Sequence, residues 1–198
     1  ACDKHLKRAR LSWEKREGTR TIPRASLVDA YSSAFQPDIV YRYGPYVFHE
    51  TLRNEIGHFN YHAALDLLVA DFGHSAITTE RIQDYFSKAA GRDLGDFFDF
   101  WVYAGFIPEV IRIEWHFDGK RFHGDVTTDV PFGSFQVPIS VNGLVHNVVL
   151  VDGSGTLELE MDDRPSEVTV DPRFKVLCKR RQAKEVKAPG TSKKGKKK

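Results

Sequence analysis

The sequence predicts an α+β fold, in which a short α-helical bundle or solenoid segment is followed by a small antiparallel β-sandwich. Two observations lead to this prediction. Between about residues 41 and 104, apolar residues recur with the helical period, and glycine or proline marks the segment ends. After Pro108 apolar and polar residues alternate, and Asp-Gly or Asn-Gly pairs separate the runs, as they do in β-hairpins.

The helical part is expected to contain four short helices. The first begins at Pro45, because proline is tolerated in the first turn of a helix. The second is expected to face inward through Phe59, Ala63 and Leu67. The third opens at Thr78, whose hydroxyl can cap the first turn. The expected ranges are 46–56, 60–71, 78–90 and 93–104.

The part after Pro108 is expected to contain six or seven short strands. In the first strand one face carries only large apolar residues: Ile111, Ile113, Trp115 and Phe117. Short strands joined by tight turns are typical of a small antiparallel β-sandwich. The expected strands cover 110–117, 120–128, 135–141, 145–151, 157–161 and 168–170.

Positive charge is concentrated at the end of the chain. Residues 179–198 contain ten Lys or Arg and one Glu, a local charge of +9. Subtracting +9 from the net charge of +2 leaves −7 for residues 1–178. The tail has almost no apolar residues and no aromatic residue to stack on bases, so we expect it to be disordered and solvated, and nucleic-acid binding is disfavoured.

The expected organisation therefore has four parts. A polar N-terminal segment covers 1–19, the helical segment 20–106, the β-sandwich 108–176 and the disordered basic tail 179–198. No apolar run is long enough to cross a membrane. Cys2 and Cys178 are too few for a disulfide framework, and they leave the compartment open. The chain begins with Ala, and we expect it to be a piece of a longer protein.

Two histidines have the spacing of a zinc-binding pair. His58 and His62 are four residues apart, which would place both on one face of a helix. A zinc peptidase helix has the motif His-Glu-x-x-His, in which the Glu is the general base, and Phe59 stands at that position here. We therefore expect two surface histidines, and we assign no metal ligands in this chain.

An ordered series of short motifs resembles a known family. Tyr41-Arg42-Tyr43-Gly44-Pro45 is similar to the Tyr-x-Lys-Gly motif that follows the zinc site in gluzincin aminopeptidases, the aminopeptidase N superfamily. Ala90-Gly91-Arg92-Asp93-Leu94 looks like that family's Ser-Gly-x-Asp-Leu turn, and Phe97-Phe98-Asp99-Phe100-Trp101 looks like its Phe-Phe-x-x-Trp. Gly105-Phe106-Ile107-Pro108 stands in for its Gly-x-Pro. The resemblance covers about residues 38–175.

The resemblance implies a role for Tyr41 and a missing partner. In the family, the matching tyrosine hydroxyl donates a hydrogen bond to the oxyanion that forms on the peptide carbonyl. The zinc ligands precede this tyrosine in the family, but no His-Glu-x-x-His motif is present here, and Tyr43 replaces the usual Lys. Zinc is therefore expected only in a complete parent protein, bound by a missing N-terminal catalytic portion.

Two functions remain open at this stage. The first is the C-terminal part of a zinc aminopeptidase-like protein, which would hydrolyse peptides when complete and would be inert as this chain alone. The second is a non-catalytic scaffold or binding module that has the aminopeptidase-like architecture without the metal.

Overall fold

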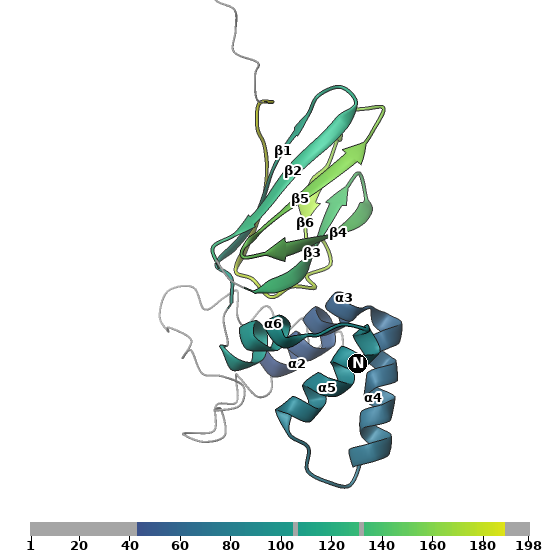
Figure 1. Cartoon of the computed structure of the whole chain (residues 1–198). Helices are drawn as coiled ribbons and strands as arrows, with labels where there is room; N and C mark the ends of the chain where they lie inside the picture. Colours follow the sequence, from purple (N-terminus) through teal and green to yellow (C-terminus); the bar gives the residue numbers. More distant parts are fainter. Residues whose placement is uncertain (1–42, 105–106, 131–132, 189–198) are drawn as a thin grey trace, which may run out of the picture.

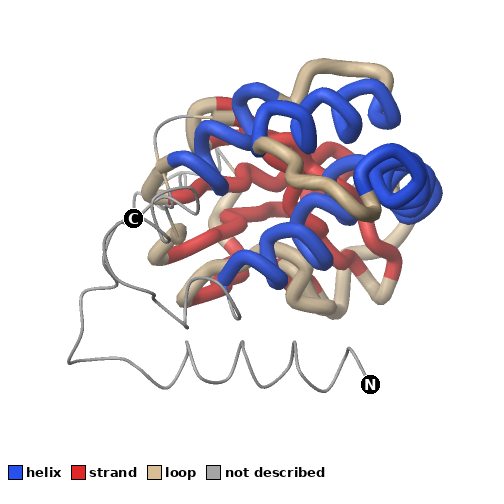
Figure 2. The backbone as a smooth tube through the Cα atoms, turned by 90° about the horizontal axis from the view of Figure 1, so that it is seen from below, coloured by secondary structure: helices blue, strands red, loops and turns tan. Residues whose placement is uncertain are grey.

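The computed structural model describes residues 43–104, 107–130 and 133–188. Helices occupy the first of these ranges and strands the other two, so the predicted α+β class is confirmed. The helices lie together at one end of the strands (Figure 1). Seen from below, they lie over that end of the sheet (Figure 2). Tyr41, the segment 1–19 and residues 189–198 of the tail lie outside the described residues.

All four expected helices are present. The first is one continuous run made of α2 (Gly44–Tyr46), the π-helical stretch η3 (Val47–Leu52) and α3 (Arg53–Ile56). The second and third are α4 (His58–Phe72) and α5 (Thr79–Ala90), which pack on each other. The fourth is α6 (Gly95–Phe98), which continues as the π-helical stretch η4 (Asp99–Tyr103). The Thr78 hydroxyl accepts a hydrogen bond from the Arg81 amide at 3.4 Å, as the capping prediction requires.

The inward face of α4 differs from the predicted one. Phe59 is 83% exposed and Leu67 is 55% exposed, whereas Tyr61 and Ala64 are buried. Apolar residues lie almost all round α4, so the helical period alone selects no face. The tertiary contact selects it instead, because the Tyr61 ring stacks on that of Phe86 in α5 at 5.6 Å.

The strand pairing gives a single sheet, whereas the predicted sandwich has two. The order across the sheet is β6-β3-β4-β5-β2-β1-β7, and only β1 and β7 pair in parallel. The edge strands β6 and β7 lie next to each other, so the sheet curls until it is nearly closed. The strands are β1 (Val110–Phe117), β2 (Arg121–Thr128), β3 (Ser134–Val141), β4 (Leu144–Val151), β5 (Ser154–Glu160), β6 (Val168–Val170) and β7 (Arg180–Glu185).

Strand β7 corrects the prediction of a disordered tail beginning at Lys179. Residues 180–185 pair in parallel with β1, and Cys178 just before them is buried. Arg181 forms an ion pair at 3.1 Å with Asp171, a carboxylate that is fully buried. Apolar periodicity could not reveal this strand, because backbone hydrogen bonds and one buried ion pair stabilise it rather than apolar side chains.

Aromatic residues join the helical part to the sheet. Phe100 and Trp101 of η4 both contact Phe135 of β3, with ring centroids 5.3 Å and 5.5 Å apart. All three side chains are buried, so the helices and the sheet share one core. Pairs of this kind add about 0.5–1.5 kcal/mol to the stability gained from area burial.

A buried carboxylate bridges the two parts at a second point. Glu55 of α3 accepts a hydrogen bond from the Gln136 amide of β3 at 2.7 Å, and it pairs with Arg92. The Gln136 side-chain amide donates in turn to the Glu55 carbonyl at 3.1 Å. Burial raises the pKa of Glu55 above its ordinary value, although the Gln136 and Arg92 contacts act in the opposite direction.

We predict that removal of β7 destabilises the protein. A chain that ends at Cys178 loses the β1–β7 ladder and leaves the Asp171 carboxylate without Arg181. Breaking a buried pair costs about 3–5 kcal/mol. Thermal denaturation followed by circular dichroism should therefore give a midpoint lower by at least about 6 °C than that of a control chain ending at Ala188. Equal midpoints for the two chains would contradict the prediction.

A second prediction concerns Glu55 and pH. Because burial raises its pKa in the folded protein, the folded state binds this proton more tightly than the unfolded state does. The contribution of Glu55 to the free energy of unfolding therefore falls as the pH rises above 4.5, the ordinary pKa of a Glu side chain. The free energy of unfolding of the wild type minus that of Glu55→Gln should decrease with rising pH, by at most about 1.4 kcal/mol per pH unit.

Urea denaturation at a series of pH values measures this difference. Glu160→Gln is the matched control, because the Glu160 side chain is 87% exposed. A difference between wild type and Glu55→Gln that stays constant over the series would show that Glu55 has the same pKa in both states.

Candidate functional site

The candidate site is the start of the first helix, because the resemblance places Tyr41 just before it. Tyr41 itself lies outside the described residues, which begin at Tyr43. Pro45 lies in the first turn of α2, as predicted, but the backbone of Tyr43 just before α2 is already helical. The following stretch η3 is π-helical, a form that is rare and is frequent at functional sites.

Tyr43 occupies the position of the family's lysine and has a structural role here. Its side chain is buried, and its hydroxyl donates a hydrogen bond to the Trp101 carbonyl at 2.7 Å. Burial raises the pKa of Tyr43 far above its ordinary value, so this phenol stays protonated. The residue therefore fixes the first helix against η4 and does not face a substrate.

The first helix also contacts the loop that follows β6. The Tyr46 hydroxyl donates to the Phe174 carbonyl, and the Thr51 hydroxyl donates to the Lys175 carbonyl at 3.0 Å. Glu50 pairs with both Arg53 at 3.0 Å and Lys175. These contacts fix the direction of the helix.

Asp171, at the start of this loop, fixes the loop's conformation through hydrogen bonds to its backbone. It adopts a left-handed backbone conformation with φ of 44°. Its carboxylate accepts hydrogen bonds from the amides of Lys175 and Val176, at 2.6 Å and 3.0 Å, in addition to the ion pair with Arg181. Burial raises the pKa of Asp171, and Arg181 is the strongest influence in the opposite direction.

One histidine of η3 is hydrogen-bonded to the neighbouring helix. His49 Nδ1 lies 2.7 Å from the hydroxyl of Tyr61 in α4. Burial and then the positive charge of Arg53 lower the pKa of His49, whereas the carboxylate of Glu50 acts in the opposite direction. The sequence did not single out this pair, because the two residues belong to different helices.

The two histidines with zinc-like spacing do lie together on α4. The ring centroids of His58 and His62 are 4.3 Å apart, and both residues are exposed. Within the described ranges, no group of three or more His, Cys, Asp or Glu side chains is arranged to hold a metal ion. The expectation that the chain has no metal ligands therefore stays a prediction.

The far end of the sheet has an open hollow of mixed charge. It is lined by Gly119, Lys120, Arg121, Glu160, Met161 and Asp162. Arg121 and Glu160 pair with each other across it at 3.7 Å. The hollow lies at the end of the sheet that is far from the helices. Among the described helices, none is both long enough and apolar enough to span a bilayer.

Comparison with solved structures finds a similar fold. The arrangement of helices and strands is similar to that of part of an aminopeptidase. No family model matches the sequence, and no curated protein matches it.

One similar solved structure is aminopeptidase A of Legionella pneumophila in complex with aspartic acid. The TM-score is 0.60 and the sequence identity 18%, over 78% of this chain. The chain spans only 18% of the length of that protein. The likeness therefore concerns the fold of a small part of a much longer polypeptide.

We predict that Arg53 contributes to the low pKa of His49. In Arg53→Gln the pKa of His49 should rise towards the ordinary value of 6.5 and remain below it, because burial still disfavours the imidazolium. Titration of the histidine resonances by NMR measures the change. Arg81→Gln, on the exposed side of α5, is the control and should leave His49 unchanged. An unchanged His49 in Arg53→Gln would refute the electrostatic assignment.

Proposed function

We propose that this chain is the C-terminal part of a zinc aminopeptidase-like protein, which hydrolyses peptides when it is complete. The observation that carries the proposal is that the family's landmarks occur in order on a fold similar to part of an aminopeptidase. The Ala90–Leu94 landmark ends α5, and Phe97–Trp101 supplies buried rings of the shared core.

The proposal assigns one catalytic residue, Tyr41. Its hydroxyl would donate a hydrogen bond to the oxyanion that forms on the scissile carbonyl. The support is indirect: Gly44 and Pro45 begin α2 directly after Tyr43, and Tyr43, Tyr46 and Glu50 hold that helix against the rest of the protein. A donor just before a fixed helix would be preorganised, and preorganised donors stabilise transition states most effectively.

Zinc does not fit the residues that the structure describes. Neither His58 with His62 nor any other described group offers three protein ligands, the number that catalytic zinc sites use. We therefore derive no step through zinc from this chain. In the proposal, the missing N-terminal catalytic portion supplies the zinc ligands, and this chain alone is inert as a peptidase.

The alternative is a non-catalytic scaffold or binding module with the same architecture. Its support is the replacement of the family's lysine by Tyr43, whose hydroxyl is used inside the core. The preceding part of the reading frame separates the two proposals. A His-Glu-x-x-His motif about 60–80 residues before Tyr41 supports the enzyme, and its absence supports the scaffold.

We predict that Tyr41→Phe in the complete, zinc-loaded protein lowers turnover of a peptide substrate about 100- to 1000-fold, with a much smaller change in KM. The substitution keeps the ring and removes only the hydroxyl donor. Steady-state kinetics measure the effect, and Tyr103→Phe is the matched control, because Tyr103 is half-buried at the end of η4.

Wild-type turnover in Tyr41→Phe would overturn the catalytic assignment of this residue. A complete protein that hydrolyses no peptide even as wild type would overturn the enzyme proposal and support the scaffold.

A further inference from the structure

The hairpin of β3 and β4 differs from the rest of the chain in its charge. Lys, Arg, Asp and Glu make up 28% of the sequence, yet residues 133–151 contain none of them. Burial does not account for this, since much of β4 is exposed: Leu144 is 70% exposed, Val149 50% and Val151 55%. Charge depletion combined with exposed apolar side chains is the composition of an interface core.

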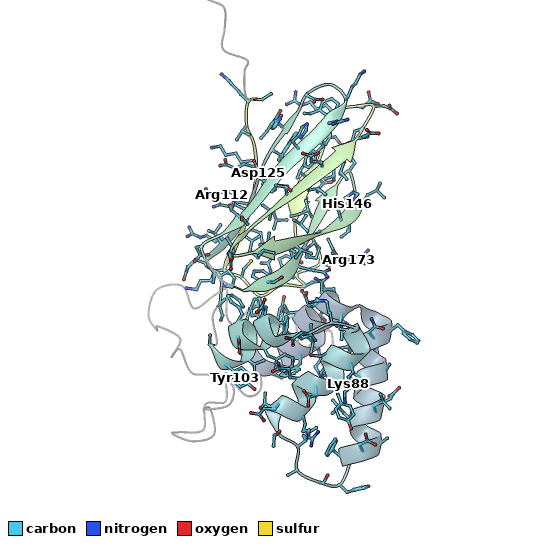
Figure 3. All side chains as sticks on the ribbon, in the orientation of Figure 1. Lys88, Tyr103, Arg112, Asp125, His146 and Arg173 are labelled. Carbon is cyan, nitrogen blue, oxygen red and sulfur yellow. The ribbon has the colours of Figure 1, made fainter. Side chains whose placement is uncertain are left out.

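The exposed valines lie on one side of β4. Val145, Val149 and Val151 alternate with His146, Val148 and Leu150, of which Val148 and Leu150 are buried inside the sheet. In Figure 3, His146 lies on the right-hand side of the sheet and Arg112, on β1, lies on the left. The uncharged face is thus separate from the charged outer face of β1 and β2.

Among the described strands, none pairs with the second edge of β4 over most of its length. Strand β3 pairs with the whole of β4 on one side, but β5 pairs with it only through Val151 and Ser154. The next residue of β5, Gly155, lies very close to Val149, because a Cβ atom on Gly155 would be 2.5 Å from the Val149 carbonyl oxygen. Strand β5 then continues beside β2.

The pairing pattern shows which backbone groups lie on this edge. The two-residue turn Asn142-Gly143, with φ of 50° and 83°, closes the hairpin at Val141 and Leu144. Hydrogen-bonded and non-hydrogen-bonded pairs then alternate, so the N–H and C=O groups of Val145 and Asn147 point away from β3. Pro138 lies opposite Asn147. Proline has no N–H to donate, which agrees with a pair that exchanges no hydrogen bonds.

We propose that two copies of this chain pair antiparallel through β4, across a two-fold axis near His146. Val145 of each copy would exchange backbone hydrogen bonds with Asn147 of the other, using the free groups identified above. Val145 of each copy would then lie on the same face of the extended sheet as Val145 and Val149 of the other copy, diagonally across the interface from them.

Charge favours a second copy as the occupant of this edge. Residues 1–178 carry a net charge of −7, so contact through most surfaces would bring like charges together. The β3–β4 face has no charge, and two copies meet there without repulsion. Natural sheets usually protect a free edge with Lys, Pro or a covering segment, and β4 itself contains neither Lys nor Pro. The inference does not depend on the proposed function, because it concerns another surface.

Sedimentation equilibrium of the full chain tests this proposal. Between about 1 µM and about 200 µM, the weight-average mass should rise from 22.5 kDa towards twice that value. Val145→Lys places the two symmetry-related lysines diagonally across the interface from each other and should weaken dimerisation at least about tenfold. Thr156→Lys makes the same change in charge on the exposed side of β5 and should leave the dimerisation constant within about twofold.

Thermal midpoints near that of the wild type establish that both variants are folded. A wild-type chain that remains monomeric over the whole concentration range overturns the proposal. A dimer that persists in Val145→Lys and is lost in Leu67→Lys also overturns it, because the contact would then lie on the apolar outer side of α4.

Discussion

Buried carboxylates determine how the helices sit on the sheet. Glu55 contacts both the backbone and the side chain of Gln136, and Asp171 accepts two backbone amides and the guanidinium of Arg181. Each is a charged group removed from water, which is tolerated only when its partners are in place. Such contacts are specific in direction, whereas the aromatic packing between η4 and β3 could tolerate small shifts. The carboxylates therefore set the orientation, and the aromatic rings of η4 and β3 are buried in the core that the two parts share.

The orientation matters for the candidate site because Tyr41 is only two residues before Tyr43 in the sequence. The described contacts attach the first helix to η4 through Tyr43, to α4 through His49, to the loop after β6 through Tyr46 and Glu50, and to β3 through Glu55. A catalytic donor at Tyr41 would gain its precision from these attachments. A scaffold would use the same attachments to present a constant surface, so the rigidity of this region is compatible with both proposed functions.

Local sequence signals predicted the elements well and their assembly poorly. Pro45 and Thr78 marked helix starts, and the Asn142-Gly143 turn marked a hairpin, because these residues act through the backbone of their own segment. The predicted buried face of α4 was wrong, because the face that is buried depends on the contact of Tyr61 with Phe86 in another helix. Strand β7 was missed because its stability comes from Asp171 and from the edge of β1.

The same distinction applies to the candidate site. Tyr41 was found through a motif and stays a prediction, because it lies outside the described residues. The pairing of His49 with Tyr61 has no sequence signal, since the two residues meet only after η3 and α4 fold against each other. A single sequence can therefore indicate which residues have suitable chemistry, but it does not show which of them meet.

The π-helical stretches also bear on how this chain can tolerate changes in length. In η4 the Ala104 amide bonds to the Asp99 carbonyl at 2.8 Å, five residues back instead of four, so the stretch holds an additional residue within its turn. Deletion of one residue there could be absorbed by a return to ordinary α-helical bonding, with the elements on both sides kept in register. The same deletion within α5 would rotate every later side chain of that helix by about 100° and move Phe86 off Tyr61.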